Sequence, residues 1–280
     1  MKYRHYAPKA PVTVVTGGAK ASARYLLTHA AENAGIICFD EFVPIFEGHI
    51  VHPLGASGDK RAQAQHVFDA LRTFDETNVA EIWAQCPDSK GLGLAIGNRL
   101  KKAAGFHVED ADDGKIVIGI TGGTGAGKTS LLRALEKEGA CVLDCDAVYH
   151  GMLETNEELR SALRSEFGDV IFRADGSVDV HAIGLIVFQD REKLTALDAL
   201  VKEYVPREVA RRMAAADAEL IGLDAIKLME CGLGAICDAT VAVTAPEEVR
   251  VKRIMARDGI TEDYARSRVA AQQSAEYFRA

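Results

Sequence analysis

The sequence has no long hydrophobic run and no internal repeat or low-complexity segment. No apolar stretch reaches the roughly 18 residues that a membrane-spanning helix needs, and the first residues lack the charged start and apolar block of a signal peptide. We therefore expect neither a membrane span nor secretion. Hydrophobic residues still make up 48% of the chain and charged residues 26%, which is typical of a globular protein and not of a disordered chain.

Cysteine is sparse, and the six cysteines form no Cys-x-x-Cys pair. They are Cys38, Cys86, Cys141, Cys145, Cys231 and Cys237. Most of them lie in apolar runs, so we predict reduced, buried side chains in a cytoplasmic protein. This usage excludes a small scaffold held together by disulfides.

An excess of positive charge is also missing, since 33 lysines and arginines stand against 41 aspartates and glutamates. The formal net charge is −8, and the pI is near 5.5. No strong overall field draws such a protein to nucleic acid or to an anionic membrane. We expect neither direct nucleic-acid binding nor a membrane partner, and the sequence leaves the oligomeric state open.

The 280 residues divide most naturally into two domains, because domains cluster around roughly 100–150 residues. Short apolar runs alternate with helical patterns, which predicts an α/β fold with parallel sheets. The predicted strands are 11–16, 35–39, 50–54, 79–84, 115–120, 141–143, 223–229 and 239–243. The predicted helices are 21–34, 60–74, 92–104, 128–138, 157–167 and much of 191–220, with two more beginning near residues 246 and 261. The acidic stretch 108–114 (VEDADDG) predicts a solvated linker between domains 1–107 and 115–280.

The strongest chemical signal follows the predicted strand 115–120. The segment Gly122-Gly-Thr-Gly-Ala-Gly127-Lys128-Thr129 fits the phosphate-loop pattern G-x-x-x-x-G-K-[ST], with a buried strand before it and an amphipathic helix after it. The predicted nucleotide-binding residues are Gly122, Gly123, Thr124, Gly125, Ala126, Gly127, Lys128, Thr129 and Ser130. Backbone N–H groups of such a loop surround phosphate oxygens, Lys128 reaches the β- and γ-phosphates, and Thr129 binds Mg²⁺ through its hydroxyl. The sequence therefore predicts a nucleoside triphosphate site.

Two aspartates follow the next strand of this part, 141–143. Because ligands bind at the carboxyl ends of strands in an open α/β sheet, Asp144 and Asp146 should face the nucleotide. Either carboxylate could accept a proton from an attacking hydroxyl or support a metal, and either could instead cap the following helix. We favour a functional role for Asp146, and a capping or supporting role for Asp144.

A predicted helix near the end of the chain carries Arg250, Arg253 and Arg257 at i, i+3 and i+7 spacing. Such a row is most often a solvated face. A phosphotransferase, however, needs cations around the transferring phosphoryl group, and the planar guanidinium suits phosphate. We favour Arg257 for this role, followed by Arg253.

Four segments together resemble dephospho-CoA kinase in order and spacing: GITGGTGAGKTS, VLDCDAVYH, FGDVIFRADGSVD and VTAPEEVRVKRIMARDGITEDYARSRVAAQ. The resemblance, over residues 115 to about 278, implies a P-loop kinase domain and ATP-dependent phosphorylation of the ribose 3′-hydroxyl of dephospho-CoA. It implies catalytic roles for Asp146 as general base, for Lys128, and for Arg257 in a closing lid, with ATP and Mg²⁺ as cofactors. It also assigns acceptor binding to residues 151–220. Where the family has a Pro-Leu-Leu-like run this chain has Ile226-Lys227-Leu228, and it lacks a family histidine near 201–203, so the acceptor pocket should differ in detail.

Relatives of the kinase part usually continue past the segment matched by 274–278 into one more strand and a helix. We therefore expect a C-terminally truncated domain in which 239–243 is an exposed edge strand and the adenine lacks one wall.

The first part resembles the C-terminal accessory domain of L-threonylcarbamoyladenylate synthase. The resemblance covers residues 1 to about 105, through MKYRHYAPKAPVTVV, DEF, LGASGDKRAQAQHVFDALRTFDE and GLGLAIGNRLKKAAG. It implies a small Rossmann-like domain without the synthase machinery. We expect Gly91, Gly93 and Gly97 to serve packing, and Thr16-Gly17-Gly18 to form only a strand-to-helix turn.

The leading hypothesis is thus a two-domain enzyme with dephospho-CoA kinase activity. An alternative is an ATP-binding accessory protein linked to tRNA threonylcarbamoyladenosine modification, without kinase turnover. A third is a broken gene product, because the chain starts inside one family pattern and stops inside another.

Overall fold

The computed structural model describes residues 7–274 and 277–279. By its contacts the chain forms two compact units. The first unit is Met1–Gly114 with Ala147–Ala214, and the second is Lys115–Asp146 with Ala215–Ala280. The chain changes unit at Gly114, where the sequence places a domain boundary, but the helices of 147–214 group with the first unit.

The first unit contains a five-stranded parallel sheet with the order β3-β2-β4-β1-β5. Its strands are β1 (Val12–Thr16), β2 (Gly35–Cys38), β3 (Ile50–Pro53), β4 (Ile82–Gln85) and β5 (Val108–Asp110). The β-branched and apolar residues of β1, β2 and β4 fill the interior, and every residue of β2 is buried. The four strands expected in this part are present.

The linker prediction is wrong for residues 108–110, which form β5 at the edge of this sheet. The register pairs Val14 with Val108, and the backbone N–H of Ala111 donates to the carbonyl of Thr16 at 3.0 Å. All three residues of β5 are exposed. An edge strand needs only backbone hydrogen bonds on one side, so acidic side chains can remain in water.

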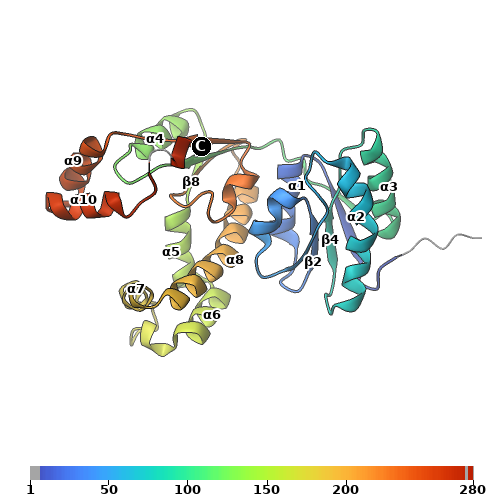
Figure 1. Cartoon of the computed structure of the whole chain (residues 1–280), viewed down its shortest axis with the longest axis horizontal. Coiled ribbons are helices and arrows are strands. Elements are labelled where there is room, and N and C mark those ends of the chain that lie inside the picture. The colour runs from blue at the N-terminus through green and yellow to red at the C-terminus, as the bar shows by residue number, and fades with distance from the viewer. Residues whose placement is uncertain (1–6, 275–276, 280) are drawn as a thin grey trace, which may run out of the picture. The chain divides into compact units, whose positions relative to one another are not determined.

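Three helices cover this sheet: α1 (Ala19–His29), α2 (Lys60–Thr73) and α3 (Leu92–Ala103). Figure 1 shows α1 on one face of the sheet and α2 with α3 on the other. Gly93 and Gly97 let α3 pack closely on the turn after β4, because an added Cβ would lie 2.3 Å from the Asp88 carbonyl oxygen and 3.0 Å from Cys86 Sγ. This geometry agrees with the packing role predicted for Gly93 and Gly97. An added Cβ at Gly91 would meet nothing within 4 Å, so the packing role predicted for Gly91 is not supported.

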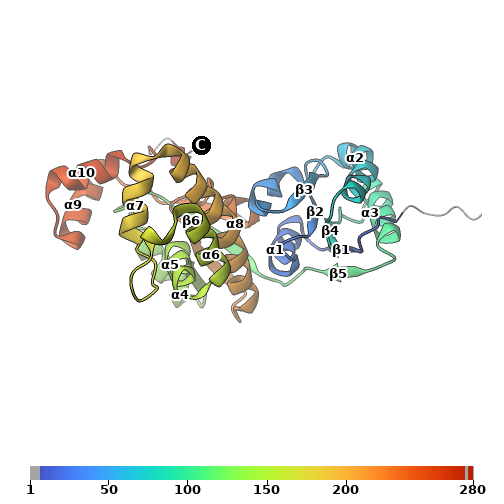
Figure 2. The same ribbon diagram turned by 90° about the horizontal axis from the view of Figure 1, so that it is seen from below.

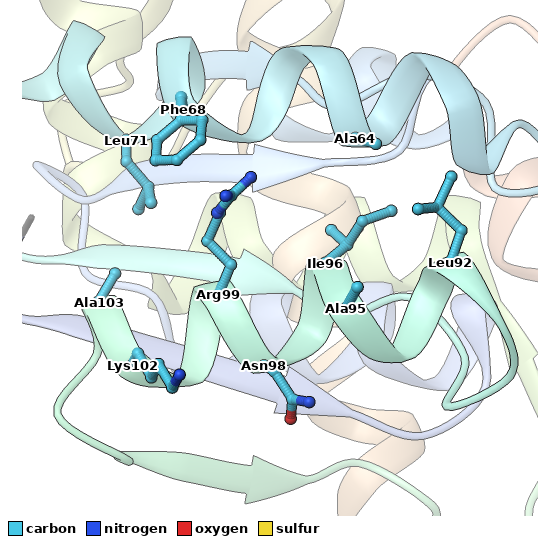
Figure 3. A pocket seen from close by; sticks show the side chains of 10 residues that line it. All are labelled: Ala64, Phe68, Leu71, Leu92, Ala95, Ile96, Asn98, Arg99, Lys102 and Ala103. Carbon is cyan, nitrogen blue, oxygen red and sulfur yellow. The ribbon is translucent and has the colours of Figure 1, made fainter. Parts of the chain in front are cut away.

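A cavity of about 330 Å³ lies between α2 and α3. Its walls are mostly apolar, and the guanidinium of Arg99 stacks over the ring of Phe68 at 3.7 Å (Figure 3). This contact covers part of Phe68, which is still 40% exposed.

The rest of the first unit is helical. The helices are α5 (Cys145–Thr155), α6 (Glu157–Phe167), α7 (Val180–Gln189) and α8 (Arg191–Ala215). Asn156 caps α6 and Asp179 caps α7 through side-chain oxygens that accept backbone N–H groups. No helix of the described residues is long and apolar enough to cross a membrane.

The second unit contains a four-stranded parallel sheet with the order β7-β8-β6-β9. Its strands are β6 (Ile116–Thr121), β7 (Cys141–Asp144), β8 (Leu220–Asp224) and β9 (Ala239–Ala242), and its helices are α4 (Lys128–Lys137), α9 (Glu247–Asp258) and α10 (Glu262–Ala270). Within the described part of the chain, β9 is an edge strand and Val241 is 40% exposed. Helices α9 and α10 lie side by side around Val251, Ile254 and Ala265 (Figures 1 and 2).

The predicted strand 223–229 begins three residues and ends five residues too late, because β8 begins at Leu220 and ends at Asp224. Ile221 and Leu223 are fully buried, whereas Met229 is 54% exposed. The backbone after Asp224 turns, and a hydrogen bond from Ala225 N–H to the Ile120 carbonyl ends the ladder. All six cysteines are free, and four of them are buried, as expected.

Candidate active site

The phosphate loop has the local structure that its sequence predicts. Strand β6 ends at Thr121, the loop follows, and α4 begins at Lys128. Gly122, Gly125 and Gly127 have φ angles of 135°, 79° and 116°, a region that residues with a Cβ rarely adopt. Gly122 must also be small, because an added Cβ would lie 2.2 Å from the Val243 carbonyl oxygen.

Lys128 is held inside the loop. Its Nζ donates to the carbonyl oxygen of Gly122 at 3.0 Å and lies 3.9 Å from Oδ1 of Asp224. The Lys128 side chain is only 12% exposed. Its charge is therefore fixed over the loop, where phosphate oxygens would be bound.

A cavity of about 390 Å³ opens beside the loop. Residues from the phosphate loop, from the carboxyl ends of β7 and β8, and from α9 and α10 line it. They include Gly123, Lys128, Thr129, Asp144, Asp146, Asp224, Arg253, Arg257 and Arg268. The structure thus brings the predicted lysine, both predicted aspartates and two of the predicted arginines to one cavity.

The two predicted aspartates differ in what they do locally. Oδ1 of Asp144 accepts the backbone N–H of Asp146 at 2.9 Å, so Asp144 caps the start of α5. Asp146 lies in the first turn of α5, and both side chains are exposed along the cavity. The capping role expected for Asp144 therefore agrees with the hydrogen bond, and Asp146 supplies a carboxylate to the cavity.

Asp224 is a site residue that the sequence analysis missed. It ends β8 directly beside Asp144, its register partner on β7. Its Oδ1 atom is buried and makes no hydrogen bond within the described residues. The pKa of Asp224 is raised to about 6, mainly by burial; Lys128 opposes this rise, and the negative charges of Asp144 and Asp146 contribute to it. The signal that could have found it is an aspartate ending the apolar run 220–223.

The arginines take two different positions. Arg253 donates from Nη1 to the carbonyl oxygens of Gly125 and Ala126, at 3.1 and 3.0 Å. These two hydrogen bonds stabilise the phosphate loop. Arg257 and Arg268 share the carboxylate of Asp258, which Arg257 contacts through two nitrogens and Arg268 through one at 2.7 Å.

The hydrogen bonds from these two guanidinium groups, that of Arg257 first, lower the pKa of Asp258 to about 2. Arg268 was not predicted, since its position depends on Asp258 of another helix.

The oxygen atoms of the cavity's side chains would bind Mg²⁺ together with the phosphates of a bound nucleotide. Among the described residues, no three acidic, histidine or cysteine side chains are placed to hold a metal ion by themselves. Mg²⁺ is commonly bound by one or two carboxylates and by substrate phosphates. Asp224, whose Oδ1 makes no hydrogen bond within the described residues, and Thr129 line the same cavity and fit such a set.

A phosphate loop with carboxylates and arginines around one cavity is suited to moving a phosphoryl group, since its charges complement the phosphates and an acceptor hydroxyl. The fold and the site thus define a P-loop phosphotransferase. Residues 116–279 match the sequence model of dephospho-CoA kinase. This match spans more than half of the chain, and the chain belongs to that family.

Individual relatives agree with this membership. The dephospho-CoA kinase of Thermobifida fusca is 35% identical over 164 residues, which are 58% of this chain and 82% of that protein. That of Anaeromyxobacter dehalogenans is 37% identical over 159 residues, covering 56% and 75% of the two chains. Among solved structures, TT1252 from Thermus thermophilus is similar with a TM-score of 0.52 and 34% identity, over 59% of this chain and 84% of that one.

The first part of the chain has a separate match. Residues 1–105 match the model of the C-terminal domain of threonylcarbamoyl-AMP synthase. Both predicted resemblances are therefore confirmed. The alternative of an accessory protein without kinase turnover is not favoured, because the named relatives over the C-terminal part are kinases.

Proposed function

We propose that this chain transfers the γ-phosphoryl group of ATP to the ribose 3′-hydroxyl of dephospho-CoA, giving coenzyme A and ADP. Membership of the dephospho-CoA kinase family supports the substrates. The observation that carries the chemistry is the single cavity that holds Lys128, Asp146 and Arg257.

The phosphate loop binds and orients ATP. Backbone N–H groups of the loop and the N-terminus of α4 surround the phosphate oxygens, and Lys128 adds a fixed positive charge. Arg257 and Arg268 supply further cations from the other side of the cavity. Both guanidinium groups contact the carboxylate of Asp258, whose single negative charge balances only one of them, so the pair keeps a net positive charge for phosphate oxygens.

Asp146 acts as the general base. Its carboxylate accepts the proton of the 3′-hydroxyl while the hydroxyl oxygen bonds to the γ-phosphorus, and the bond from that phosphorus to the β–γ bridging oxygen breaks to release ADP. Asp144 is less suited to this step, because its Oδ1 already accepts the Asp146 N–H. Asp224 is less suited because its Oδ1 atom is buried and lies 3.9 Å from the ammonium group of Lys128.

Thr129 and Asp224 are the residues that would hold Mg²⁺. The ion supplies positive charge that balances the phosphate oxygens. The sequence resemblance assigns acceptor binding to residues 151–220. We also propose that the enzyme is cytoplasmic, which agrees with six cysteines that form no disulfide.

Phosphoryl transfer is tested by measuring ADP release from ATP with and without dephospho-CoA, and by the mass of the product. We expect ADP only with the acceptor, and one phosphate added to the acceptor. A matched control replaces dephospho-CoA by its 3′-deoxy analogue, which should release no ADP. ATP binding without acceptor-dependent turnover, or ADP release that the acceptor does not change, would reject the proposal.

A further inference from the structure

Arg250 in α9 and Gln272 just after α10 form hydrogen bonds to three atoms of Thr124 in the phosphate loop. Gln272 accepts the Thr124 backbone N–H through Oε1 at 2.8 Å and donates from Nε2 to Thr124 Oγ1 at 2.7 Å. Arg250 donates from Nε to the Thr124 carbonyl oxygen at 3.0 Å. Arg250 also donates from Nη2 to Oε1 of Gln272 at 2.7 Å, which closes the network.

The network is packed tightly against the loop. Arg250 is only 9% exposed, and an added Cβ at Gly123 would lie 2.2 Å from its Nη2 atom. An added Cβ at Gly125 would lie 2.8 Å from the Arg250 carbonyl oxygen. The loop and the start of α9 therefore fit together without space for a further carbon atom.

We propose that Gln272 and Arg250 are positioning residues for ATP, an inference that rests on the proposed function. A loop with four glycines has many accessible conformations, and ordering it opposes binding. By fixing Thr124 before the nucleotide arrives, the two side chains remove part of that entropic cost. They touch the loop and not the transferred group, so they set the affinity for ATP and leave the chemical step unchanged.

The geometry also defines the opposite possibility. Oε1 of Gln272 occupies the Thr124 N–H, a donor that a phosphate oxygen could use instead. If Gln272 competed with phosphate, its removal would strengthen ATP binding. The two ideas predict opposite changes in the same dissociation constant.

The test compares Gln272→Ala with Gln273→Ala in the full chain. Gln273 is the exposed neighbour and serves as the matched control. Among the residues that the structure describes, its side chain makes one long hydrogen bond, from Nε2 to Glu230 Oε1 at 3.5 Å. Calorimetric titration with ATP needs no acceptor, so it reports on the network even if turnover of dephospho-CoA fails. Turnover then gives KM for ATP, KM for dephospho-CoA and kcat separately.

We expect Gln272→Ala to raise Kd and KM for ATP about tenfold, the effect of losing one or two hydrogen bonds. The value of kcat, KM for dephospho-CoA and the melting temperature should stay near those of the wild type. For Gln273→Ala all five quantities should stay near the wild-type values.

Arg250→Lys keeps the charge, but one nitrogen cannot replace the two donors, so it should also weaken ATP binding. Combined with Gln272→Ala it should add less than its separate effect. Unchanged or tighter ATP binding by Gln272→Ala, or an equal loss in Gln273→Ala, would overturn the proposal.

Discussion

Replacing Asp224 by asparagine should make the nucleotide-free protein more stable at neutral pH. Burial raises the pKa of this carboxyl from 3.8 to about 6 despite the attraction of Lys128, and its side chain is 17% exposed. A carboxyl with a raised pKa binds its proton more tightly in the folded chain than in the unfolded chain. Folding therefore loses stability as the pH rises from 3.8 to about 6, and the full loss is present above that range.

The size of the effect follows from the shift in pKa. At about 1.36 kcal/mol per pKa unit, the shift corresponds to about 2–3 kcal/mol in the free energy of unfolding at pH 7 and above. Asparagine has nearly the shape of the protonated carboxyl and removes this penalty. Near pH 4, folded Asp224 is mostly protonated, so most of the difference between variant and wild type should vanish.

Denaturant unfolding of both proteins near pH 7.5 and pH 4, without nucleotide, measures this difference. Asp217→Asn is a suitable control, because Asp217 is exposed and its replacement should change stability little. The stabilised Asp224→Asn protein should nevertheless lose turnover, since a proposed Mg²⁺ ligand is gone. Equal stability at neutral pH, or a gain of the same size at both pH values, would refute the reasoning.

Four further substitutions test the roles proposed for the cavity. Lys128→Ala should abolish turnover with an unchanged circular dichroism spectrum, and retention of most of the activity would reject its role. Asp146→Asn should lower kcat by roughly 10²–10⁴ with little change in ATP affinity, whereas a larger loss in Asp144→Asn would move the base to that residue. Arg257→Ala should lower kcat by roughly 10²–10³ in the same turnover assay, as removal of one charge-stabilising donor does, and an unchanged kcat would exclude it from the reaction.

The sequence predicted the parts of the site that depend on local patterns. The phosphate loop has fixed spacing between its glycines and Lys128, and the structure places it between β6 and α4 as expected. Asp146 follows β7, whose end was predicted to within one residue: the predicted strand ends at 143 and β7 ends at Asp144.

The sequence missed the features that depend on distant contacts. Apolar residues continue past Asp224, so only the pairing of β8 with β6 shows where the strand ends. Strand β5 carries acidic side chains and is defined by its backbone pairing with β1 alone. Arg268 is held in place by a hydrogen bond to Asp258, ten residues earlier on another helix, and no local sequence spacing predicts that partner.

The close contact between Gly123 and Arg250 links the evolutionary paths of these two positions. A β-carbon at position 123 would lie 2.2 Å from Arg250 Nη2 and 2.8 Å from Gln272 Oε1, so a side chain there requires these two side chains to move. Moving them gives up hydrogen bonds to Thr124. Descendants with a shorter residue at 250 should therefore accept alanine at 123 more readily than those that keep arginine.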